Sequence, residues 1–297
     1  MKIQQVLVFV IVLVVIAASI FGYLQSVSYD STGDGLEIGY SVKSNFQYLD
    51  NVPIPAGDLN AYDIILLPDL YEEGKGFTCT GLAFDESTNT FLVGEIGALL
   101  PGEQITGSIV RVTRDFSRVL ERIPVSSTNT KGVQGVALDT SDNTIWFCYP
   151  NGNKIWHISI SGKNMGSITT SRPTGIAYDE RDDTFWVLSF DGNIRHITKS
   201  GTVLKTIAFS FNEPLDQCFL DEHRGLLYIT AGANYSGRNN VYCLNISTEE
   251  QYIACTVDSY AVEGIWLGNN DRMIILNDGY FHGAIVDKNQ VNVYAIG

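Results

Sequence analysis

The sequence predicts an all-β protein, a β-propeller of five recognisable four-stranded blades, preceded by one N-terminal transmembrane helix. Three observations carry this prediction: a motif that returns roughly every 45 residues, strand-like segments separated by turn residues inside each unit, and a long apolar stretch at the start of the chain. The composition agrees, since 11% aromatic residues and 28 glycines among 297 residues suit pleated strands joined by tight turns.

The repeated motif is clearest in GLAFD, GVALD and GIAYD, and it continues in a weaker QCFLD and a diverged GIWLG. The five copies begin at Gly81, Gly135, Gly175, Gln217 and Gly264. In every copy a second strand-like segment follows the last motif residue at an offset of six residues. Units of this length without helical periodicity are typical of propeller blades. A β-sandwich would also alternate strands and turns, but it would not repeat one motif five times.

The third unit shows the four strands that a blade needs. GIAYD reads as the inner strand, followed by FWVLS, NIRHIT and VLKTIAF. The turns between them, residues 191–193 and 199–201, consist of Gly, Asn, Asp, Ser and Lys, which fits hairpin connections. The inner strand is almost wholly apolar, as expected for a strand packed on both faces between neighbouring blades.

The two ends of the propeller sequence are predicted to share one blade. Residues 292–296 (NVYAI) resemble residues 240–244 (NVYCL), the third strand of the fourth unit, so the chain stops after a third strand. Ala61–Pro68 (AYDIILLP) reads as a fourth strand without a blade of its own. Pairing the two leaves no open sheet edge. Five blades result, or six if residues 36–49 contain a diverged one.

The N-terminal stretch from Val6 to Leu24 contains nineteen residues without a charge. As a helix it would be about 28 Å long, close to the thickness of a bilayer. Lys2 precedes it and acidic residues follow it, which predicts a cytoplasmic N-terminus and a periplasmic or extracellular propeller. The predicted organisation is a stub and signal-anchor at 1–28, a tether at 29–60 and a propeller at 61–297, with residues 6–24 in the membrane. A cleaved signal peptide, with Ala17 and Ser19 before the cut, is the alternative and would give a secreted protein.

Charge and cysteine content narrow the partners and the compartment. A net charge of −14 argues against nucleic acid as a partner. The five cysteines match neither a zinc ribbon nor a CxxC redox pair. Cys243 and Cys255 could form a disulfide in an oxidising compartment, the alternative being small buried apolar side chains. Asn234 and Asn245 begin glycosylation sequons, which matter if the host is eukaryotic.

The repeat and the segment DGNIRHITKSG resemble the NHL and gluconolactonase-like propellers. The sequence resembles more closely the SdiA-regulated family, whose members pair an N-terminal membrane segment with a propeller. Glu95-Ile96-Gly97, Val262–Ile265 and Asn277-Asp278-Gly279 carry this likeness. In gluconolactonase-like families a ring of oxygen ligands in the axial channel holds a divalent cation that polarises an ester or a lactone. The resemblance therefore implies that Ca²⁺ or Mg²⁺ is a possible cofactor.

The candidate site is the mouth of the axial channel, where inner strands begin and second strands end. The residues preceding the repeated glycine position are Thr80, Gln134, Thr174, Asp216 and Glu263, and the ends of the second strands add Glu95, Asn151, Asp191, Asn277 and Asp278. Carboxylate oxygens suit hard cations, which makes Glu95, Asp216 and Glu263 the candidate metal ligands. The alternative is a hydrated channel mouth with solvated carboxylates.

The histidines contribute one further candidate. His157 and His196 occupy equivalent positions in successive units, which indicates packing, and His223 falls in a turn. His282 follows the Asn277-Asp278-Gly279 loop and could reach a functional face.

The predicted function is a membrane-anchored binding module for a protein, a glycan or a small ligand. A divalent-metal-dependent esterase or lactonase is the first alternative, and a structural surface or virion component is the second. Whether the chain is an enzyme stays open at this point, because no nucleophile elbow, zincin helix or P-loop occurs in the sequence.

Overall fold

The computed structural model describes residues 56–67, 77–97, 107–128, 132–231, 237–268, 272–279 and 289–296, all within the compact unit Val52–Gly297. The predicted anchor, most of the tether, Asn234 and His282 lie outside the described residues. Within the described residues, none of the helices has the length and apolarity needed to cross a membrane.

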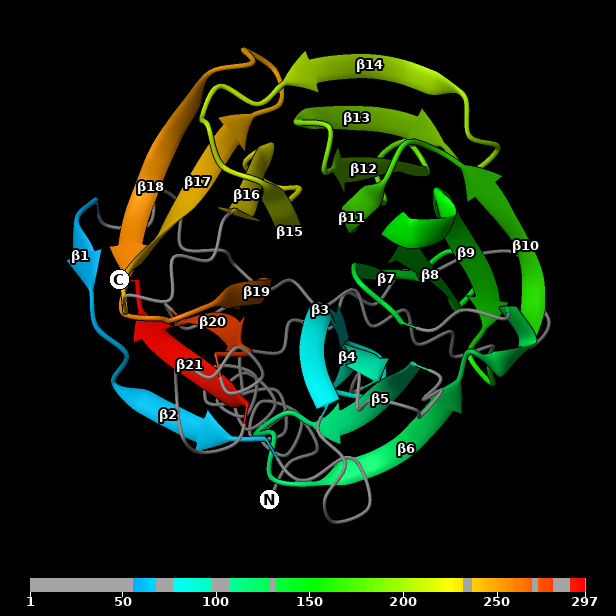
Figure 1. The fold of residues 1–297 in the computed structure, drawn as a ribbon, viewed down its shortest axis with the longest axis horizontal. Coiled ribbons are helices and arrows are strands. Elements are labelled where there is room, and N and C mark those ends of the chain that lie inside the picture. Colours follow the sequence, from blue (N-terminus) through cyan, green and yellow to red (C-terminus); the bar gives the residue numbers. More distant parts are fainter. Residues whose placement is uncertain are drawn as a thin grey trace, which may run out of the picture. The chain divides into compact units, whose positions relative to one another are not determined.

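The unit Val52–Gly297 is a five-bladed β-propeller, as predicted (Figure 1). Blades 1 and 2 consist of β3 (Phe77–Asp85), β4 (Thr90–Gly97), β5 (Ser108–Thr113) and β6 (Val119–Pro124), and of β7 (Val136–Asp139), β8 (Thr144–Tyr149), β9 (Lys154–Ser159) and β10 (Asn164–Thr169). Blades 3 and 4 consist of β11 (Pro173–Asp179), β12 (Thr184–Ser189), β13 (Asn193–Thr198) and β14 (Val203–Ala208), and of β15 (Leu215–Asp221), β16 (Leu226–Ala231), β17 (Asn239–Asn245) and β18 (Gln251–Val257). Blade 5 consists of β19 (Val262–Gly268), β20 (Arg272–Asn277), β21 (Gln290–Ala295) and β2 (Asp63–Leu66). Two short 3₁₀ helices, η1 (Ser126–Thr128) and η2 (Pro150–Gly152), lie between strands.

The inner strands β3, β7, β11, β15 and β19 surround one axis, and each contacts the inner strands of both neighbouring blades (Figure 1). The core is divided accordingly into five apolar clusters, one between each pair of adjacent blades. Between blades 1 and 5, for example, Phe91 stacks on Phe116 with ring centroids 4.7 Å apart and meets the edge of Trp266 at 5.1 Å. The inner strands are apolar because both of their faces meet such a cluster.

The ring closes as predicted, through the two ends of the propeller sequence. β2 pairs antiparallel with β21, with Asp63 opposite Val293 and Leu66 opposite Gln290. The fourth strand of blade 5 therefore comes from the start of the propeller and its first three from the end. This pairing removes the open edge that β21 would otherwise present.

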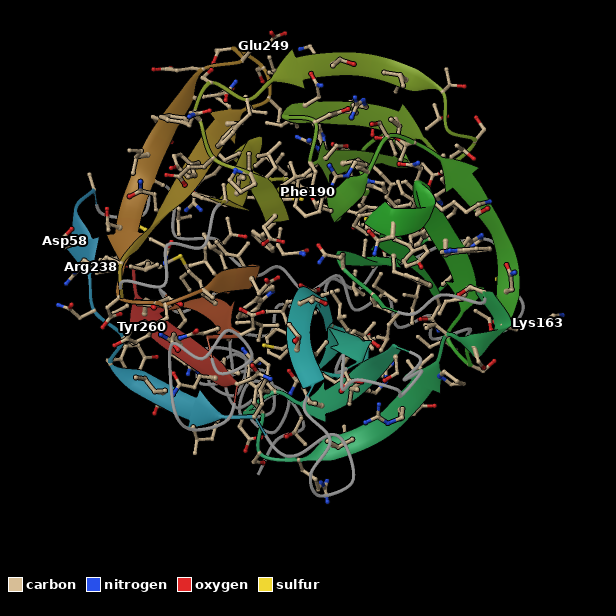
Figure 2. The ribbon with its side chains drawn as sticks, viewed as in Figure 1. Asp58, Lys163, Phe190, Arg238, Glu249 and Tyr260 are labelled. Atoms are coloured by element: carbon tan, nitrogen blue, oxygen red, sulfur yellow. The ribbon has the colours of Figure 1, made fainter. Side chains whose placement is uncertain are left out.

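A short strand corrects the predicted boundary of the tether. β1 (Asp58–Leu59) pairs parallel with β18 and extends blade 4 by a fifth strand. The Ala61 amide donates to Asp258 Oδ1 at 2.8 Å, and Arg238 lies beside Asp58 with Nη1 and Oδ2 3.7 Å apart (Figure 2). Residues 58–59 are therefore part of the propeller. The sequence does not predict them, because two residues can pair with the outer strand but are too few to show a strand periodicity.

Of the two alternatives for Cys243 and Cys255, the disulfide is not formed. All five cysteines are free and buried. The register of β17 and β18 places Cys255 opposite Val241 and Cys243 opposite Tyr252, so the two thiols are not cross-strand partners. Both pack in the apolar cluster between blades 4 and 5. The alternative reading, small buried apolar side chains, describes them.

The structural role predicted for His157 and His196 is confirmed. Each Nε2 hydrogen bonds to a threonine at the start of the preceding strand, Thr144 at 2.8 Å and Thr184 at 2.6 Å. Each imidazole ring also stacks on the tryptophan that lies two residues after that threonine. The ring centroids are 4.0 Å apart for His157 on Trp146 and 4.5 Å apart for His196 on Trp186.

Candidate functional site

In blades 1, 3, 4 and 5 the residue before the repeated glycine position lies in a bulge of the inner strand. In β3, β11, β15 and β19 the register with the second strand shifts at the same place, and the two residues passed over are the pre-glycine residue and its successor. A bulge leaves backbone groups unpaired within their own sheet. These groups are therefore available to the neighbouring blade.

Blades are joined at the axis by these bulges. The Gly81 amide donates to the Gln134 carbonyl of blade 2 at 2.9 Å, and the Gly135 amide donates to the Thr174 carbonyl of blade 3 at 2.6 Å. A Cβ at Gly81 would lie 2.5 Å from the Gln134 oxygen, and one at Gly264 would lie 2.7 Å from the Thr80 oxygen. The repeated glycine is thus required because backbones of adjacent blades approach each other there.

In blade 4 the contact with the next blade at the axis is made through a side chain. Gln217 occupies the position that glycine holds in the other blades. Its backbone amide donates a hydrogen bond to Thr230 Oγ1 at 3.1 Å. The Thr230 hydroxyl in turn donates to the Glu263 carbonyl of blade 5 at 3.0 Å. One hydroxyl group therefore spans the gap that a direct backbone contact closes elsewhere. The missing glycine in QCFLD is the only sequence signal for this arrangement, and it does not identify Thr230.

Three of the five pre-glycine side chains carry a buried oxygen atom that lacks a hydrogen-bond partner among the described residues. These atoms are Gln134 Oε1, Thr174 Oγ1 and Glu263 Oε2, from blades 2, 3 and 5. In blade 1, by contrast, Thr80 Oγ1 donates to the Val133 carbonyl at 2.7 Å. A buried acceptor without a donor costs about 1–3 kcal/mol, so these oxygens mark a place where a ligand, a cation or water is favoured.

Acidic side chains from three blades act on one another beside these oxygens. Burial raises the pKa of Glu263 well above its ordinary value, and the nearby carboxylates of Asp216 and Asp278 raise it further. Burial, Asp278, Glu263 and Glu95 likewise raise the pKa of the Cys79 thiol. Glu263 therefore keeps its proton at pH values where an exposed glutamate is ionised.

Glu95 belongs to this cluster but is neutralised within blade 1. Its side chain is fully buried, and Oε2 lies 2.7 Å from Arg122 Nη1 and accepts a hydrogen bond from the Ser108 hydroxyl. A cation bound by Glu95 would have to compete with this arginine.

The other predicted site residues serve turns. Asn277 is buried and accepts the Gly279 amide at 3.0 Å. Asp191 forms an ion pair with Arg195 at 2.6 Å in its own hairpin, and Asn151 is exposed in η2. Of the predicted set, Asp216 and Asp278 both act on Glu263. Thr174 shares the bulge position of Asp216 and Glu263, and Gln134 holds the equivalent place in the sequence repeat just before β7.

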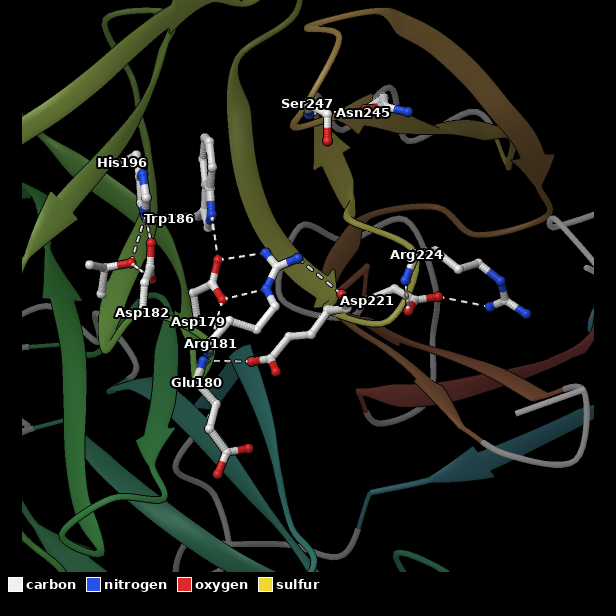
Figure 3. Close-up of polar contacts among 12 residues, drawn as sticks. Asp179, Glu180, Arg181, Asp182, Trp186, His196, Asp221, Arg224, Asn245 and Ser247 are labelled. Carbon is white, nitrogen blue, oxygen red and sulfur yellow. Dashed lines mark hydrogen bonds and ion pairs between the residues drawn. The ribbon is translucent and has the colours of Figure 1, made fainter. Parts of the chain in front are cut away.

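The metal-ligand prediction was Glu95, Asp216 and Glu263, and these three do not bring ligand atoms within 4.8 Å of one another. Among the described residues that criterion is met by Asp179, Asp182 and His196. Asp179 is already held by Arg181 through two contacts of 2.8 and 2.7 Å and by Trp186 Nε1 at 3.2 Å (Figure 3). The Arg181 guanidinium group would repel a cation here, so this cluster is structural. Cation binding at the axis stays a prediction.

The comparisons with known proteins extend no further than the fold. No family model and no curated protein matches the chain. Solved structures that are similar include the WD40 repeats of RRP9 (15% identity over 73% of this chain and 62% of that one, TM-score 0.46) and a protein of unknown function from Bacteroides thetaiotaomicron (16%, 72% and 58%, TM-score 0.49). A nidogen/laminin complex is another (14%, 72% and 84%, TM-score 0.47). The chain spans about 60% of the first two proteins. At these identities the likeness concerns the fold alone, and the SdiA-regulated or gluconolactonase-like membership stays a prediction.

Proposed function

We propose that the protein is an extracytoplasmic binding module, tethered by residues 6–24, whose axial end receives a cation or a hydrogen-bond donor of its ligand. The observation that carries this proposal is the set of buried oxygens without partners at equivalent positions of blades 2, 3 and 5. A donor or a cation would satisfy the Gln134 carbonyl oxygen, whereas the Thr174 hydroxyl and a protonated Glu263 can also donate to a ligand.

Calcium is the simplest ligand that fits this chemistry. Carboxylate, amide and hydroxyl oxygens are the ligands that Ca²⁺ prefers, and Glu263, Asp216, Gln134 and Thr174 supply all three kinds. Glu263 would release its proton on binding, because a cation favours the ionised form. A bound cation would thus take the place of the Glu263 proton.

The test is a melting experiment on the full-length, chelator-treated protein in detergent. Millimolar Ca²⁺ should raise the melting temperature, since a ligand at a hundredfold excess over its Kd stabilises the folded state by about 2.7 kcal/mol. Glu263→Gln should remove most of this rise. Asp191→Asn is the control: its carboxylate is held by Arg195 in a hairpin, and the calcium response should persist.

A wild-type protein that melts at the same temperature with and without Ca²⁺ and Mg²⁺ would overturn the cation part of the proposal. Hydrolysis of lactones or esters that requires the metal and is lost in Glu263→Gln would replace the binding function with the esterase alternative.

A further inference from the structure

A second site candidate shares none of its lining residues with the axial carboxyl cluster. A cleft of about 1180 Å³ opens between blades 1 and 5. Blade 5 contributes an apolar wall of Ile65, Ile274 and Val293, and blade 1 contributes the turn between β5 and β6. Three arginines line the cleft: Arg114, Arg118 and Arg272.

These arginines differ from most others in the described part of the chain. Arg111, Arg122, Arg181, Arg195 and Arg224 each form an ion pair of 2.6–2.8 Å with a carboxylate. Among the described residues, none of the three cleft arginines has such a pair. Arg114 donates to the neutral Asn89 Oδ1 at 3.0 Å and lies over the Phe84 ring. Arg272 is half-buried, and its Nε atom is buried without an acceptor among the described residues.

The two acidic side chains of the cleft offset only two of these three positive charges. Asp115 Oδ1 accepts the Thr113 hydroxyl at 2.6 Å and the Ser117 amide at 3.1 Å, so its carboxylate is used to hold the turn. These hydrogen bonds also lower the pKa of Asp115 to about 2. Asp63 is the other acid lining the cleft. Three guanidinium groups thus face two carboxylates in a chain whose net charge is −14.

A partly buried guanidinium group such as that of Arg272 loses hydration, and without a counter-ion no interaction offsets this loss. An anionic ligand would offset the lost hydration. Guanidinium groups bind phosphate and sulfate through paired hydrogen bonds, and Arg272 Nε is one donor available for this geometry. The apolar wall beside the arginines favours a ligand with a carbon skeleton over a free ion.

We propose that this cleft binds a phosphate or sulfate group carried by a small organic ligand, with the oxyanion between Arg118 and Arg272 and the carbon skeleton against Ile65, Ile274 and Val293. The site is independent of the axial carboxyl cluster and of opposite charge preference.

Calorimetric titration of the full-length protein in detergent, at constant ionic strength, tests the proposal. The probes are inorganic phosphate, inorganic sulfate, hexyl phosphate and hexyl sulfate. Saturable binding of at least one alkyl ester is expected. Loss of one charged hydrogen bond in Arg118→Gln or Arg272→Gln should weaken it about tenfold or more. Arg118 is exposed, so its replacement leaves the fold intact.

Arg172→Gln is the matched control. Arg172 is exposed, lies over the Phe190 ring of blade 3 at 5.0 Å and has no ion pair among the described residues. Its replacement should leave the affinity unchanged. Absence of saturable binding for all four probes, or an equal loss in Arg172→Gln, would overturn the site. Equal affinity for inorganic and alkyl esters would overturn the role of the apolar wall.

Discussion

Thr230 links blade 4 to blade 5 at the axis, where blade 4 lacks the repeated glycine. Its hydroxyl accepts from the Gln217 amide and donates to the Glu263 carbonyl, and the side chain is fully buried. We expect Thr230→Val, which keeps the shape and removes the hydroxyl, to lower the free energy of unfolding by about 1–3 kcal/mol, because a buried amide loses its acceptor. Thr230→Ser keeps the hydroxyl and should cost clearly less. Urea denaturation of the two variants checks this, and equal losses would show that the methyl group matters rather than the bridge.

Glu263 should make stability depend on pH. Its folded-state pKa lies above its ordinary value near 4.5, so the folded state binds more protons than the unfolded state above that pH. The contribution is fully favourable below pH 4.5 and is lost as the pH rises through the folded-state value. Without divalent cations, Glu263→Gln should therefore be relatively more stable than the parent at pH 8 than at pH 5. Urea titrations at both values measure this, and a mutant that parallels the parent at both would contradict the raised pKa.

At the residue scale the sequence predicts positions better than partners. The repeat identifies Gly81, Gly135 and Gly264 as equivalent and places Glu263 directly before its glycine, where the bulge recurs in β3, β11, β15 and β19. It does not predict that Arg122 neutralises Glu95. That pair depends on the register of three strands, which no short motif encodes.

At the scale of elements, a buried aspartate ends each of the first four inner strands: Asp85, Asp139, Asp179 and Asp221. The motif predicts these acids, but the cation that neutralises each one comes from a different place. Arg111 belongs to β5, Arg181 and Arg224 to the turn after their own strand, and Lys199 to the neighbouring blade. The acid is set by the repeated strand, whereas its partner is set by whichever element packs against that strand's end.

The Lys199–Asp139 pair should be the most informative of these contacts, because it joins blade 3 to blade 2. Nζ lies 2.6 Å from a carboxylate that is fully buried. Lys199→Met leaves that charge without its cation and should cost about 3 kcal/mol of unfolding free energy. Lys205→Met is the control, since its pair with Glu249 is solvent-exposed and worth about 1 kcal/mol or less. Both pairs join neighbouring blades, so comparable losses in the two variants, measured by thermal or urea denaturation, would show that burial gives the Lys199–Asp139 pair no special role.

At the scale of the whole molecule, closure of the ring was predictable because the last strand repeats an earlier one. Residues 292–296 align with 240–244, and the structure places them as third strands of blades 5 and 4. The parallel strand β1 was not predictable, since residues 58–59 carry no pattern. The axial oxygens without partners could be located by the repeat. Their burial follows only from the approach of five inner strands.

Closure predicts how much of the N-terminus the propeller needs. β2 supplies the outer strand of blade 5, and Leu67 directly after it is fully buried in the cluster between blades 1 and 5. Removing both exposes the backbone groups of β21 as a free edge and opens that cluster. We expect deletion of residues 1–28 to leave a folded, soluble domain that melts cooperatively, and deletion of 1–68 to cause aggregation or loss of cooperative melting.

Deletion of residues 1–60 separates the two short strands. It removes β1, which adds only two residues to the edge of blade 4, but it keeps β2 and Leu67. Because β18 still pairs with β17, blade 4 stays intact, and this variant should melt cooperatively at a slightly lower temperature than the 1–28 deletion. Calorimetry and light scattering on the three deletions measure the series. Equal melting of the 1–28 and 1–68 deletions would mean that β2 is dispensable, so the stability of the ring would have to come from the bulge contacts at the axis rather than from its shared blade.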